Sequence, residues 1–498
     1  MDTEKMTRAM ARWWQTVNDR NDPDARPMLY DPLQGSKTTK GSQYLATIIV
    51  CMSAAAAGTG LSWSNCLDQL KKNGTNSSEM QGAEIQSTGI QLTEEQATMV
   101  ASCLAIGAII GAIPSGILAD MKGRKTAAIL ITFPYIISFL LIVFAQNVWW
   151  LYISRILIGI AIGGSCVVCP LYISEYAESS IRGTLGTCFQ LFLTIGILFV
   201  FTVGAYSTYI TLSWLCLIPP ILNLIGLFFL PESPIWLLKK HEETKAATAI
   251  KWFWGRHCNA NTAIQAIKNE LEAAGSGSGS IRDLFAVRAN RRGFLICVSL
   301  MFFQQFSGIN AVIFFATKIF KDAGSTMEAS TCSIIVGVVQ VLMTFASAAL
   351  VERAGRKILL LFSSTVMALC LATLGYYFFL KDSGHNVSNI GIIPLLSLVI
   401  FIICFSLGYG PIPWMMMGEM MAADIKGIAT SLTVEFNWIS VFIITSSFEP
   451  LKTALGPAYT FWIFGVIMAI GSVYGLMVLF ETKGKSSTEI QMILAGRK

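Results

Sequence analysis

Long apolar stretches alternate with shorter polar ones along almost the whole chain. A stretch of about 20 apolar residues is long enough to cross the hydrocarbon core of a bilayer as an α-helix. Twelve such stretches cover residues 44–66, 97–119, 127–147, 149–173, 184–206, 211–230, 294–317, 330–350, 358–380, 390–417, 428–449 and 457–480. The pattern predicts an all-α membrane protein with twelve transmembrane helices.

Composition agrees with a lipid environment. Hydrophobic residues make up 54% of the 498 residues and charged residues only 13%, whereas a typical soluble protein has about 25% charged residues. The segment before residue 44 is polar and basic, unlike a short apolar leader with a cleavage site. We therefore expect a multi-pass protein that keeps its first span, with both termini on one side of the membrane.

The positive charges indicate which side that is, because Lys and Arg are retained in cytoplasmic loops. With the amino terminus inside, 29 of the 36 Lys and Arg residues are cytoplasmic, six are external, and Arg155 lies within a span. Three glycosylation sequons then lie outside, at Asn73, Asn76 and Asn386. The formal charge of +6 is spread over loops that flank the membrane, so no nucleic-acid partner is expected.

The largest polar break divides the spans into two sets of six. It has helical patterns followed by GSGSGS at residues 275–280, a flexible linker composition. We expect a cytoplasmic tail, an N-terminal six-helix half, a cytoplasmic connector with short helices, a C-terminal six-helix half and a second cytoplasmic tail. Their boundaries are residues 1–43, 44–230, 231–292, 293–480 and 481–498.

Short charged motifs recur in the same order in both halves. GILADMKGRK after the second span matches ALVERAGRK after the eighth, PLYISEYAESSIRG after the fourth matches PWMMMGEMMAADIKG after the tenth, and PESP matches FETKG at the close of each half. Three matches in one order indicate a duplication. Duplicated halves related by an axis along the membrane normal are a transporter plan, with the substrate held between them.

The charges in these motifs are candidates for a cytoplasmic latch. We expect ion pairs between helix ends, such as one between Glu175 and Arg182, that tie the helices together when the inner face is closed. The alternative is that they are ordinary charges at the membrane interface. The predicted latch residues are Asp120, Arg124, Glu175, Arg182, Glu232, Glu352, Arg356, Glu419, Lys426 and Glu481.

Uncharged amides interrupt the seventh apolar stretch at QQFSGIN. A polar uncharged solute loses its hydrogen bonds to water on entering a dry cavity, and an amide can replace them without adding charge. Gln304, Gln305 and Asn310 are therefore candidate ligands for such a solute. The alternative is that these amides join neighbouring helices. The further candidate amides within spans are Gln190, Gln340 and Asn437.

The tenth stretch contains helix-breaking residues beside a tryptophan. Gly410, Pro411 and Pro413 interrupt the helix next to Trp414. Such a break predicts a hinge that can move against the binding site.

With RILIGIAIGG at residues 155–164 and GPIPW at residues 410–414, these motifs resemble the sugar porter branch of the major facilitator superfamily, the glucose-transporter type. Among its members, the chain looks most like the facilitated trehalose and hexose transporters of insects. The resemblance implies that Gln190, Gln304, Gln305 and Asn310 contact the sugar. It also implies that Trp414 lies against the sugar ring, as suits a flat apolar face with one N–H.

The chain departs from the family pattern at several positions. Many relatives have two tyrosines after the asparagine motif, whereas this chain has Phe314 and Phe315. An external gate at these positions would lack phenolic hydroxyls. The departures affect the expected substrate more than the expected fold.

The expected function is facilitative transport, or uniport, of a hexose or trehalose by alternating access. Proton-coupled relatives carry an aspartate in the first span, and the first span here has no acid, with Arg155 counted as the remaining ionisable residue within the membrane. The alternatives are a proton-coupled sugar symporter and a non-transporting sugar sensor on the same fold.

No nucleophile, base and metal-ligand arrangement occurs in the spans, so an enzyme, a catalytic site, a metal site and a cofactor are not expected. We expect a sugar and the lipid bilayer as partners, a monomeric protein, and a location in the cell membrane.

Overall fold

The computed structural model describes residues 39–70, 90–178, 180–274, 281–310, 312, 329–385, 387 and 390–496. The predicted gate residues Phe314 and Phe315 and the sequon residues Asn73, Asn76 and Asn386 lie outside these ranges.

The described part of the N-terminal half contains seven α-helices and one short 3₁₀ helix. They are α2 (Gly41–Ser62), η1 (Trp63–Leu70), α3 (Glu94–Lys122), α4 (Arg124–Val143), α5 (Val148–Tyr176), α6 (Arg182–Gly204), α7 (Tyr209–Leu215) and α8 (Ile218–Phe229). The sixth span is divided between α7 and α8. Pro219 and Pro220 occupy the first turn of α8, where the missing backbone N–H groups would be unpaired in any case.

The described part of the C-terminal half repeats this plan. It contains α13 (Arg288–Phe306), α15 (Ala329–Ala354), α16 (Arg356–Asp382), α17 (Ile393–Leu407), α18 (Ile412–Met420), α19 (Lys426–Leu455) and α20 (Pro457–Met477). The tenth span is divided into α17 and α18 at the predicted glycine and proline cluster.

Shorter helices gather at one end of the molecule. They are α9 (Pro234–Lys239), α10 (Glu243–Trp254), α11 (Ala260–Ala274), α12 (Ile281–Ala286) and, near the C-terminus, α21 (Ser487–Ala495). The seventh long helix begins at Arg288, so the predicted connector boundary at residue 292 lies inside α13. Its first turns carry Arg288, Arg291 and Arg292, and these charges make the start of the helix invisible to an apolar pattern.

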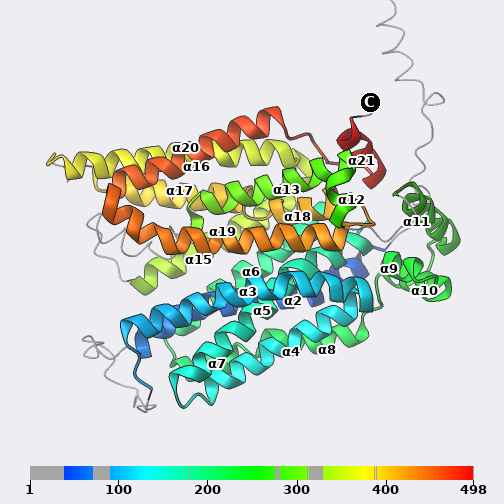
Figure 1. The fold of residues 1–498 in the computed structure, drawn as a ribbon, viewed down its shortest axis with the longest axis horizontal. Coiled ribbons are helices and arrows are strands. Elements are labelled where there is room, and N and C mark those ends of the chain that lie inside the picture. Colours follow the sequence, from blue (N-terminus) through cyan, green and yellow to red (C-terminus); the bar gives the residue numbers. More distant parts are fainter. Residues whose placement is uncertain are drawn as a thin grey trace, which may run out of the picture.

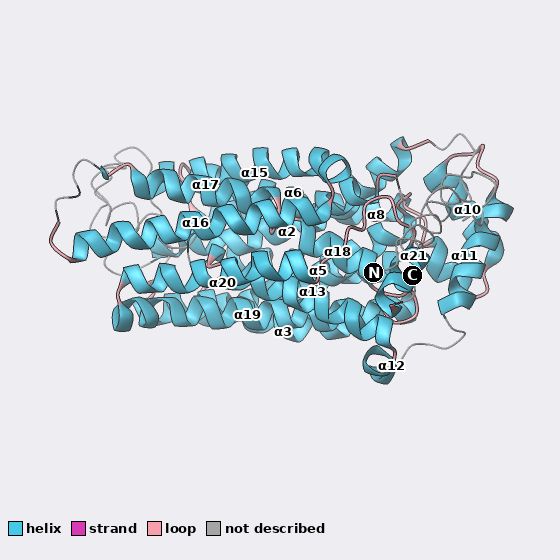
Figure 2. Ribbon diagram, turned by 90° about the horizontal axis from the view of Figure 1, so that it is seen from above, coloured by secondary structure: helices cyan, strands magenta, loops and turns pink. Residues whose placement is uncertain are grey.

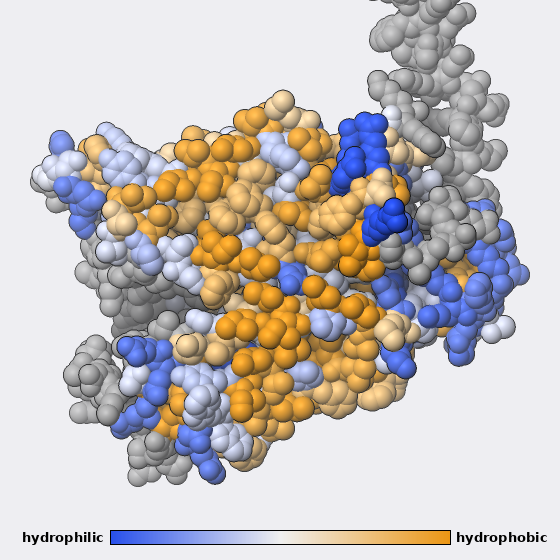
Figure 3. Space-filling model, in the orientation of Figure 1, coloured by the Kyte–Doolittle hydropathy of each residue, from blue (hydrophilic) through white to orange (hydrophobic). Residues whose placement is uncertain are grey.

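The long helices form two bundles that lie side by side (Figure 1), and from above they run nearly parallel (Figure 2). The bundles meet where α3 packs against α19 and α6 against α15. On the face shown in Figure 3, mostly apolar residues cover the middle of the helices, and hydrophilic residues lie at both ends. Among the described residues, eleven helical segments are long and apolar enough to cross a membrane. The protein is a multi-pass membrane protein.

Glycines allow α3 and α5 to pack closely in the N-terminal half. A methyl group added at Gly107 or Gly111 of α3, or at Gly159 or Gly163 of α5, would collide with a carbonyl oxygen of the other helix. Small residues permit this backbone approach within a membrane. The close contact accounts for the glycines of the RILIGIAIGG motif.

Candidate functional site

The break in the tenth span exposes carbonyl groups that other helices satisfy. Pro411 and Pro413 lack the N–H groups that would bond to the Leu407 and Tyr409 carbonyls in a continuous helix. Ser347 Oγ of α15 donates to the Leu407 oxygen at 2.7 Å. Gln304 Nε2 of α13 donates to the Tyr409 oxygen at 2.7 Å and to the Gly410 oxygen at 3.0 Å. The break is therefore tied to two neighbouring helices.

The oxygen of the Gln304 amide is used within the protein as well. It accepts hydrogen bonds from Asn437 Nδ2 of α19 at 3.1 Å and from Gln305 Nε2 at 3.3 Å. The exposed fractions of Gln304 and Asn437 are 3% and 1%. Both side chains, predicted as sugar ligands, thus join helices α13, α18 and α19 in this structure.

Gln305 and Asn310 approach each other where α13 ends. The helix ends at Phe306, and Gly308 adopts a φ of +80°, a conformation that side chains other than glycine's rarely adopt. This turn brings Asn310 Nδ2 to 2.6 Å from Gln305 Oε1. The Asn310 amide oxygen has no hydrogen bond within the described part of the chain.

Several polar groups on α6 and α15 have no hydrogen-bond partner among the described residues. Gln190 of α6 is 9% exposed, and its amide makes no hydrogen bond to a described residue. On α15, the Gln340 oxygen and the Thr344 hydroxyl are buried and are also unpaired among the described residues. Most buried polar groups in proteins are hydrogen-bonded. Unpaired groups on α6 and α15, which pack together, therefore indicate a place for a polar ligand.

Trp414 lies at the same boundary. Its ring packs against Phe189 of α6 with a centroid separation of 5.4 Å. A small cavity on the cytoplasmic side of Trp414 is enclosed by α5, α6 and α18 and lined in part by Ser174, Arg182 and Met415. Trp414 thus separates this cavity from Phe189.

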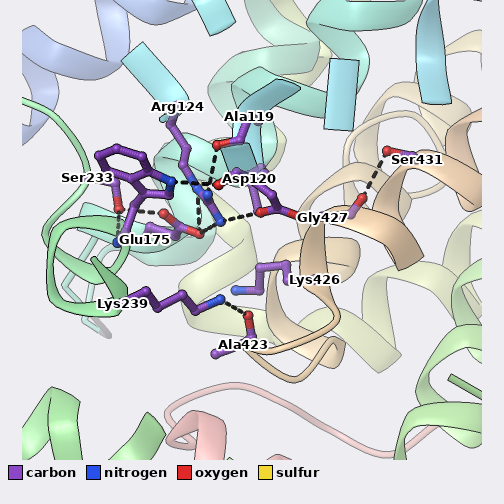
Figure 4. A network of polar contacts seen from close by, with 12 residues as sticks. Ala119, Asp120, Arg124, Glu175, Ser233, Lys239, Ala423, Lys426, Gly427 and Ser431 are labelled. Atoms are coloured by element: carbon purple, nitrogen blue, oxygen red, sulfur yellow. Dashed lines mark hydrogen bonds and ion pairs between the residues drawn. The ribbon is translucent and has the colours of Figure 1, made fainter. Parts of the chain in front are cut away.

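A buried arginine organises the cytoplasmic end of the N-terminal half (Figure 4). The Arg124 guanidinium lies 2.7 Å from Glu175 Oε1 and 3.0 Å from Asp120 Oδ1, and it donates to the Ala119 carbonyl at 3.0 Å. Ser233 Oγ donates to the second Glu175 oxygen. The network joins α3, α4 and α5 to the start of the connector.

Glu232 closes the same network from the connector. Its carboxylate accepts hydrogen bonds from the Arg124 and Lys125 backbone N–H groups, at 2.8 and 3.0 Å. These groups form the N-terminus of α4, where a carboxylate is favoured by the helix dipole. Burial raises the pKa of Glu232, although the backbone N–H groups act in the opposite direction.

The C-terminal half contains a copy of this arrangement. Arg356 contacts Glu419 at 2.8 Å and Glu352 at 3.0 Å, and Thr482 Oγ1 donates to the second Glu419 oxygen at 2.7 Å. Glu481 accepts from the backbone N–H of Arg356 at 2.9 Å, as Glu232 does from Arg124. The duplication inferred from the motifs is thus repeated in the side-chain contacts.

The predicted pairing of Glu175 with Arg182 is wrong. Glu175 pairs with Arg124, and its counterpart Glu419 pairs with Arg356. Among the described residues, Arg182 donates only to the Ala177 carbonyl at 3.4 Å, and its Nε is unpaired. Because α5 ends at Tyr176 and α6 begins at Arg182, spacing along the chain did not reveal which groups approach in space.

Carboxylates from each half reach helix N-termini of the other half. Glu352 accepts a hydrogen bond at 2.8 Å from the Gly183 N–H in the first turn of α6. Asp120 faces Gly427 in the first turn of α19, where an added methyl group would collide with the carboxylate. Further hydrogen bonds between the halves are Lys426 Nζ to Ser174 Oγ at 3.3 Å and Thr184 Oγ1 to the Ala348 carbonyl at 3.2 Å. Lys239 of the connector also donates to the Ala423 carbonyl of the C-terminal half at 2.5 Å. The cytoplasmic face is closed by these contacts.

Arg155 is stabilised inside the membrane by uncharged groups. It donates to the Gly60 carbonyl at 2.9 Å and to Ser64 Oγ at 2.6 Å, and its guanidinium lies 5.5 Å from the centre of the Trp63 ring. A cation over an indole face is favourable. In the described part of the chain, no ion pair involves Arg155.

The prediction that Arg155 is the remaining ionisable residue within the membrane is wrong. Glu435 lies in α19, within a segment, Lys426–Phe448, that could span the bilayer. Its Oε2 atom is buried and has no hydrogen-bond partner among the described residues. Glu435 falls inside the predicted eleventh span, 428–449. The prediction missed it because it looked for a proton-carrying acid only in the first span.

Comparison with known proteins gives one family across nearly the whole chain. Residues 36–494 match the family described as "Sugar (and other) transporter". The facilitated trehalose transporter Tret1 of Polypedilum vanderplanki is 40% identical over 412 residues, which cover 82% of each chain. The protein of the same name from Culex quinquefasciatus is 38% identical over 411 residues, 82% of this chain and 80% of that one.

Among solved structures, the proton:xylose symporter XylE bound to 6-bromo-6-deoxy-D-glucose superposes with a TM-score of 0.78. The match covers 92% of this chain and all of that one, at 24% identity. The inward open form of XylE from E. coli gives a TM-score of 0.65 at 23% identity. The likeness confirms the predicted fold class, two six-helix halves of the major facilitator type.

Proposed function

Since the chain belongs to the sugar (and other) transporter family, we propose that it carries a hexose or trehalose across the membrane by facilitated alternating access. The observation that carries this proposal is the set of unpaired polar groups where α6 and α15 meet, above a closed cytoplasmic face. The names of the relatives from Polypedilum vanderplanki and Culex quinquefasciatus support trehalose as a substrate.

Gln190, Gln305, Asn310 and Gln340 supply the sugar contacts in this proposal. Each has amide capacity that the described protein groups leave unused, and sugar hydroxyls both donate and accept hydrogen bonds. Trp414 covers one face of the sugar ring with its indole. These side chains come from both halves, so a bound sugar bridges the halves and favours conformations in which they approach.

Gln304 and Asn437 act behind these contacts. Gln304 donates to the carbonyls of the α17–α18 break, and Asn437 donates to the oxygen of the Gln304 amide. Movement of the break is therefore transmitted to Gln305 through the Gln304 amide. The hinge in this proposal is a hydrogen-bonded joint that shifts with the binding site.

The inner latch opens by separating the halves at two equivalent places. Glu352 leaves the N-terminus of α6 and Asp120 leaves the N-terminus of α19, while Arg356 and Arg124 retain them within their own halves. The arginine networks therefore hold the acids in position to close again.

The substitution Q190A tests the binding site. We expect sugar affinity to fall by an amount that corresponds to about 1–3 kcal/mol, because a buried hydrogen bond to a hydroxyl is lost. Concentration dependence of counterflow in proteoliposomes measures this. Q265A, a glutamine of α11 whose amide bonds to Asn269 outside the spans, is the matched control and should leave affinity unchanged. Equal affinities for Q190A and Q265A would remove Gln190 from the site.

A proton-coupled symporter is the second candidate, because Glu435 places an acid inside a span. We expect sugar to equilibrate across the membrane and not to accumulate, since the first span offers no acid near Arg155. In sealed proteoliposomes with an imposed inward proton gradient, internal and external sugar concentrations should become equal. Uphill accumulation that collapses with a protonophore would establish symport instead.

The proposal also places the protein in the plasma membrane and takes the monomer as the functional unit. Both halves of one chain contribute the proposed sugar contacts, so a single chain forms a complete site. The sequons at Asn73, Asn76 and Asn386 remain predicted glycosylation positions on the external side.

A further inference from the structure

Glu435 is a carboxyl group that the proposed sugar site does not use. It lies nine residues after the start of α19 at Lys426, which places it about 13 Å along the helix from the cytoplasmic end. A glutamate side chain is too short to bring its carboxyl group from that depth to the membrane surface. An ionisable residue at such a depth is energetically costly, and residues of this kind usually mark a functional site.

The periodicity of α19 directs this half-buried residue towards the seam between the halves. Gly427, Ser431 and Glu435 follow one another at intervals of four residues and so lie along one stripe of α19. The first two contact α3: Gly427 faces Asp120, and a methyl group at Gly116 would collide with Ser431. Glu435 continues this stripe by one turn towards the middle of the membrane. Hydrophilic atoms interrupt the apolar surface along the line between α3 and α19 (Figure 3).

The sugar-site amides lie on another face of α19. Asn437 bonds to Gln304 inside the C-terminal bundle, and two residues correspond to about 200° around a helix. Glu435 therefore points away from the amide cluster, and its role is separate from sugar contact.

No nearby charge explains the acid. Asp120 of α3 lies at the level of Gly427, two turns closer to the cytoplasm. On the other helices packed against α19, the ionisable groups within the membrane include Cys166 on α5, Cys297 on α13 and Tyr474 on α20. Among the described residues, none of these groups forms a hydrogen bond or ion pair with Glu435.

We propose that Glu435 is a proton-binding site that controls the opening of the cytoplasmic face. The carboxyl group is neutral while α3 and α19 are in contact, because an unpaired carboxylate is strongly disfavoured in an apolar setting. When the helices separate, water from the cytoplasm reaches it, the O–H bond breaks and the proton passes to that water. On closure the proton returns from the same side, so no proton crosses the membrane.

The sign of the effect follows from linkage. A proton that binds more tightly to the closed form stabilises that form. Acidification of the cytoplasmic side therefore favours the closed inner face, and alkalinisation favours the inward-open form. The proposal rests on alternating access as proposed above, but it does not depend on which sugar is carried.

Accessibility of the inner cavity tests the proposal without sugar. Met415 is buried beside the cavity below Trp414, so the variant M415C should react with a membrane-impermeant maleimide only when the inner face opens. The rate of thiol alkylation rises with pH in any variant. The measured quantity is therefore the alkylation rate of M415C with Glu435 intact divided by the rate of M415C carrying E435Q, at each cytoplasmic pH. We expect this ratio to rise with cytoplasmic pH by about 5-fold to 150-fold, the usual range of allosteric couplings.

The matched control is E95Q, which removes an exposed carboxylate from the opposite end of α3. The alkylation rate of M415C with Glu95 intact, divided by the rate of M415C carrying E95Q, should stay constant with pH. A ratio for E435Q that does not change with pH would overturn the proposal. Infrared spectra offer a second measure: a carboxylic acid band at neutral pH should disappear in E435Q, and its absence from the unsubstituted protein would be equally decisive. Failure of sugar transport with the pH-dependent ratio intact would contradict only the transport function.

Discussion

The variant R124A is expected to lose the closed cytoplasmic face and much of its thermal stability. Arg124 is 1% exposed and pairs with Glu175, which is also buried. Removing one partner of a buried ion pair costs about 3–5 kcal/mol, because the other charge remains buried without compensation. The substitution also releases Asp120, which reaches the first turn of α19 from the other half. Both effects disfavour the closed form.

Thermal unfolding in detergent and alkylation of M415C from the cytoplasmic side measure the two consequences of R124A. The variant R356A should behave alike, because Arg356 holds Glu419 and Glu352 in the same way. The matched control is R182A, which removes an arginine at the same membrane face that pairs with no carboxylate among the described residues. Equal losses of thermal stability and of closure in R182A and R124A would show that any positive charge at this membrane face has the same effect. The ion-pair networks would then have no specific role.

The double variant R124A with E175Q separates repulsion from packing. If the loss in R124A arises from an unpaired buried carboxylate, neutralising Glu175 should recover a large part of the stability. No recovery would assign the loss to the missing guanidinium bonds to Ala119 and Asp120.

The variant Q304A is expected to destabilise the tenth helix more than it changes the sugar contacts directly. It leaves the Tyr409 and Gly410 carbonyls without their donor from α13 and leaves Asn437 with only the Met301 sulfur as an acceptor. Each unsatisfied buried group costs about 1–3 kcal/mol. The combined loss should lower the thermal unfolding temperature and reduce the maximal rate of counterflow.

The variant Q305A is the natural comparison for Q304A. It removes the neighbouring amide, whose partners are the side chains of Gln304 and Asn310 and not the backbone of the break. We expect Q305A to weaken sugar affinity with a smaller change in unfolding temperature. If Q304A instead lowers affinity with unchanged stability, Gln304 is a direct sugar ligand as its position in the motif suggested.

The fold could be predicted from sequence because apolar length and charge asymmetry are dictated by the bilayer itself. The start of α13 could not, since Arg288, Arg291 and Arg292 continue the helix beyond the apolar region. A helix continues as long as its backbone hydrogen bonds continue, also outside the membrane. A hydropathy pattern detects only the part of the helix that lies in lipid.

Ion pairs between helix ends could also be predicted, but their partners could not, and Arg182 pairs with no carboxylate among the described residues. Repetition matched Arg124 with Arg356 and Glu175 with Glu419, whereas the contact of Arg124 with Glu175 depends on the packing of α4 against α5. The need for a donor such as Gln304 could be predicted in part, because Pro411 and Pro413 leave two carbonyls without helical donors. Which side chain would supply those donors is decided by the approach of α13 to the break.

Two of the contacts between the halves have the form of an isologous interface, in which the same patch on each body receives the other. Glu352 meets Gly183 while Asp120 meets Gly427, so each half offers an acid and a glycine. Such an interface opens symmetrically, because neither half is the donor or the receiver of the contact. A substitution in either half consequently removes one of these two contacts and disfavours the closed form, whichever half carries it.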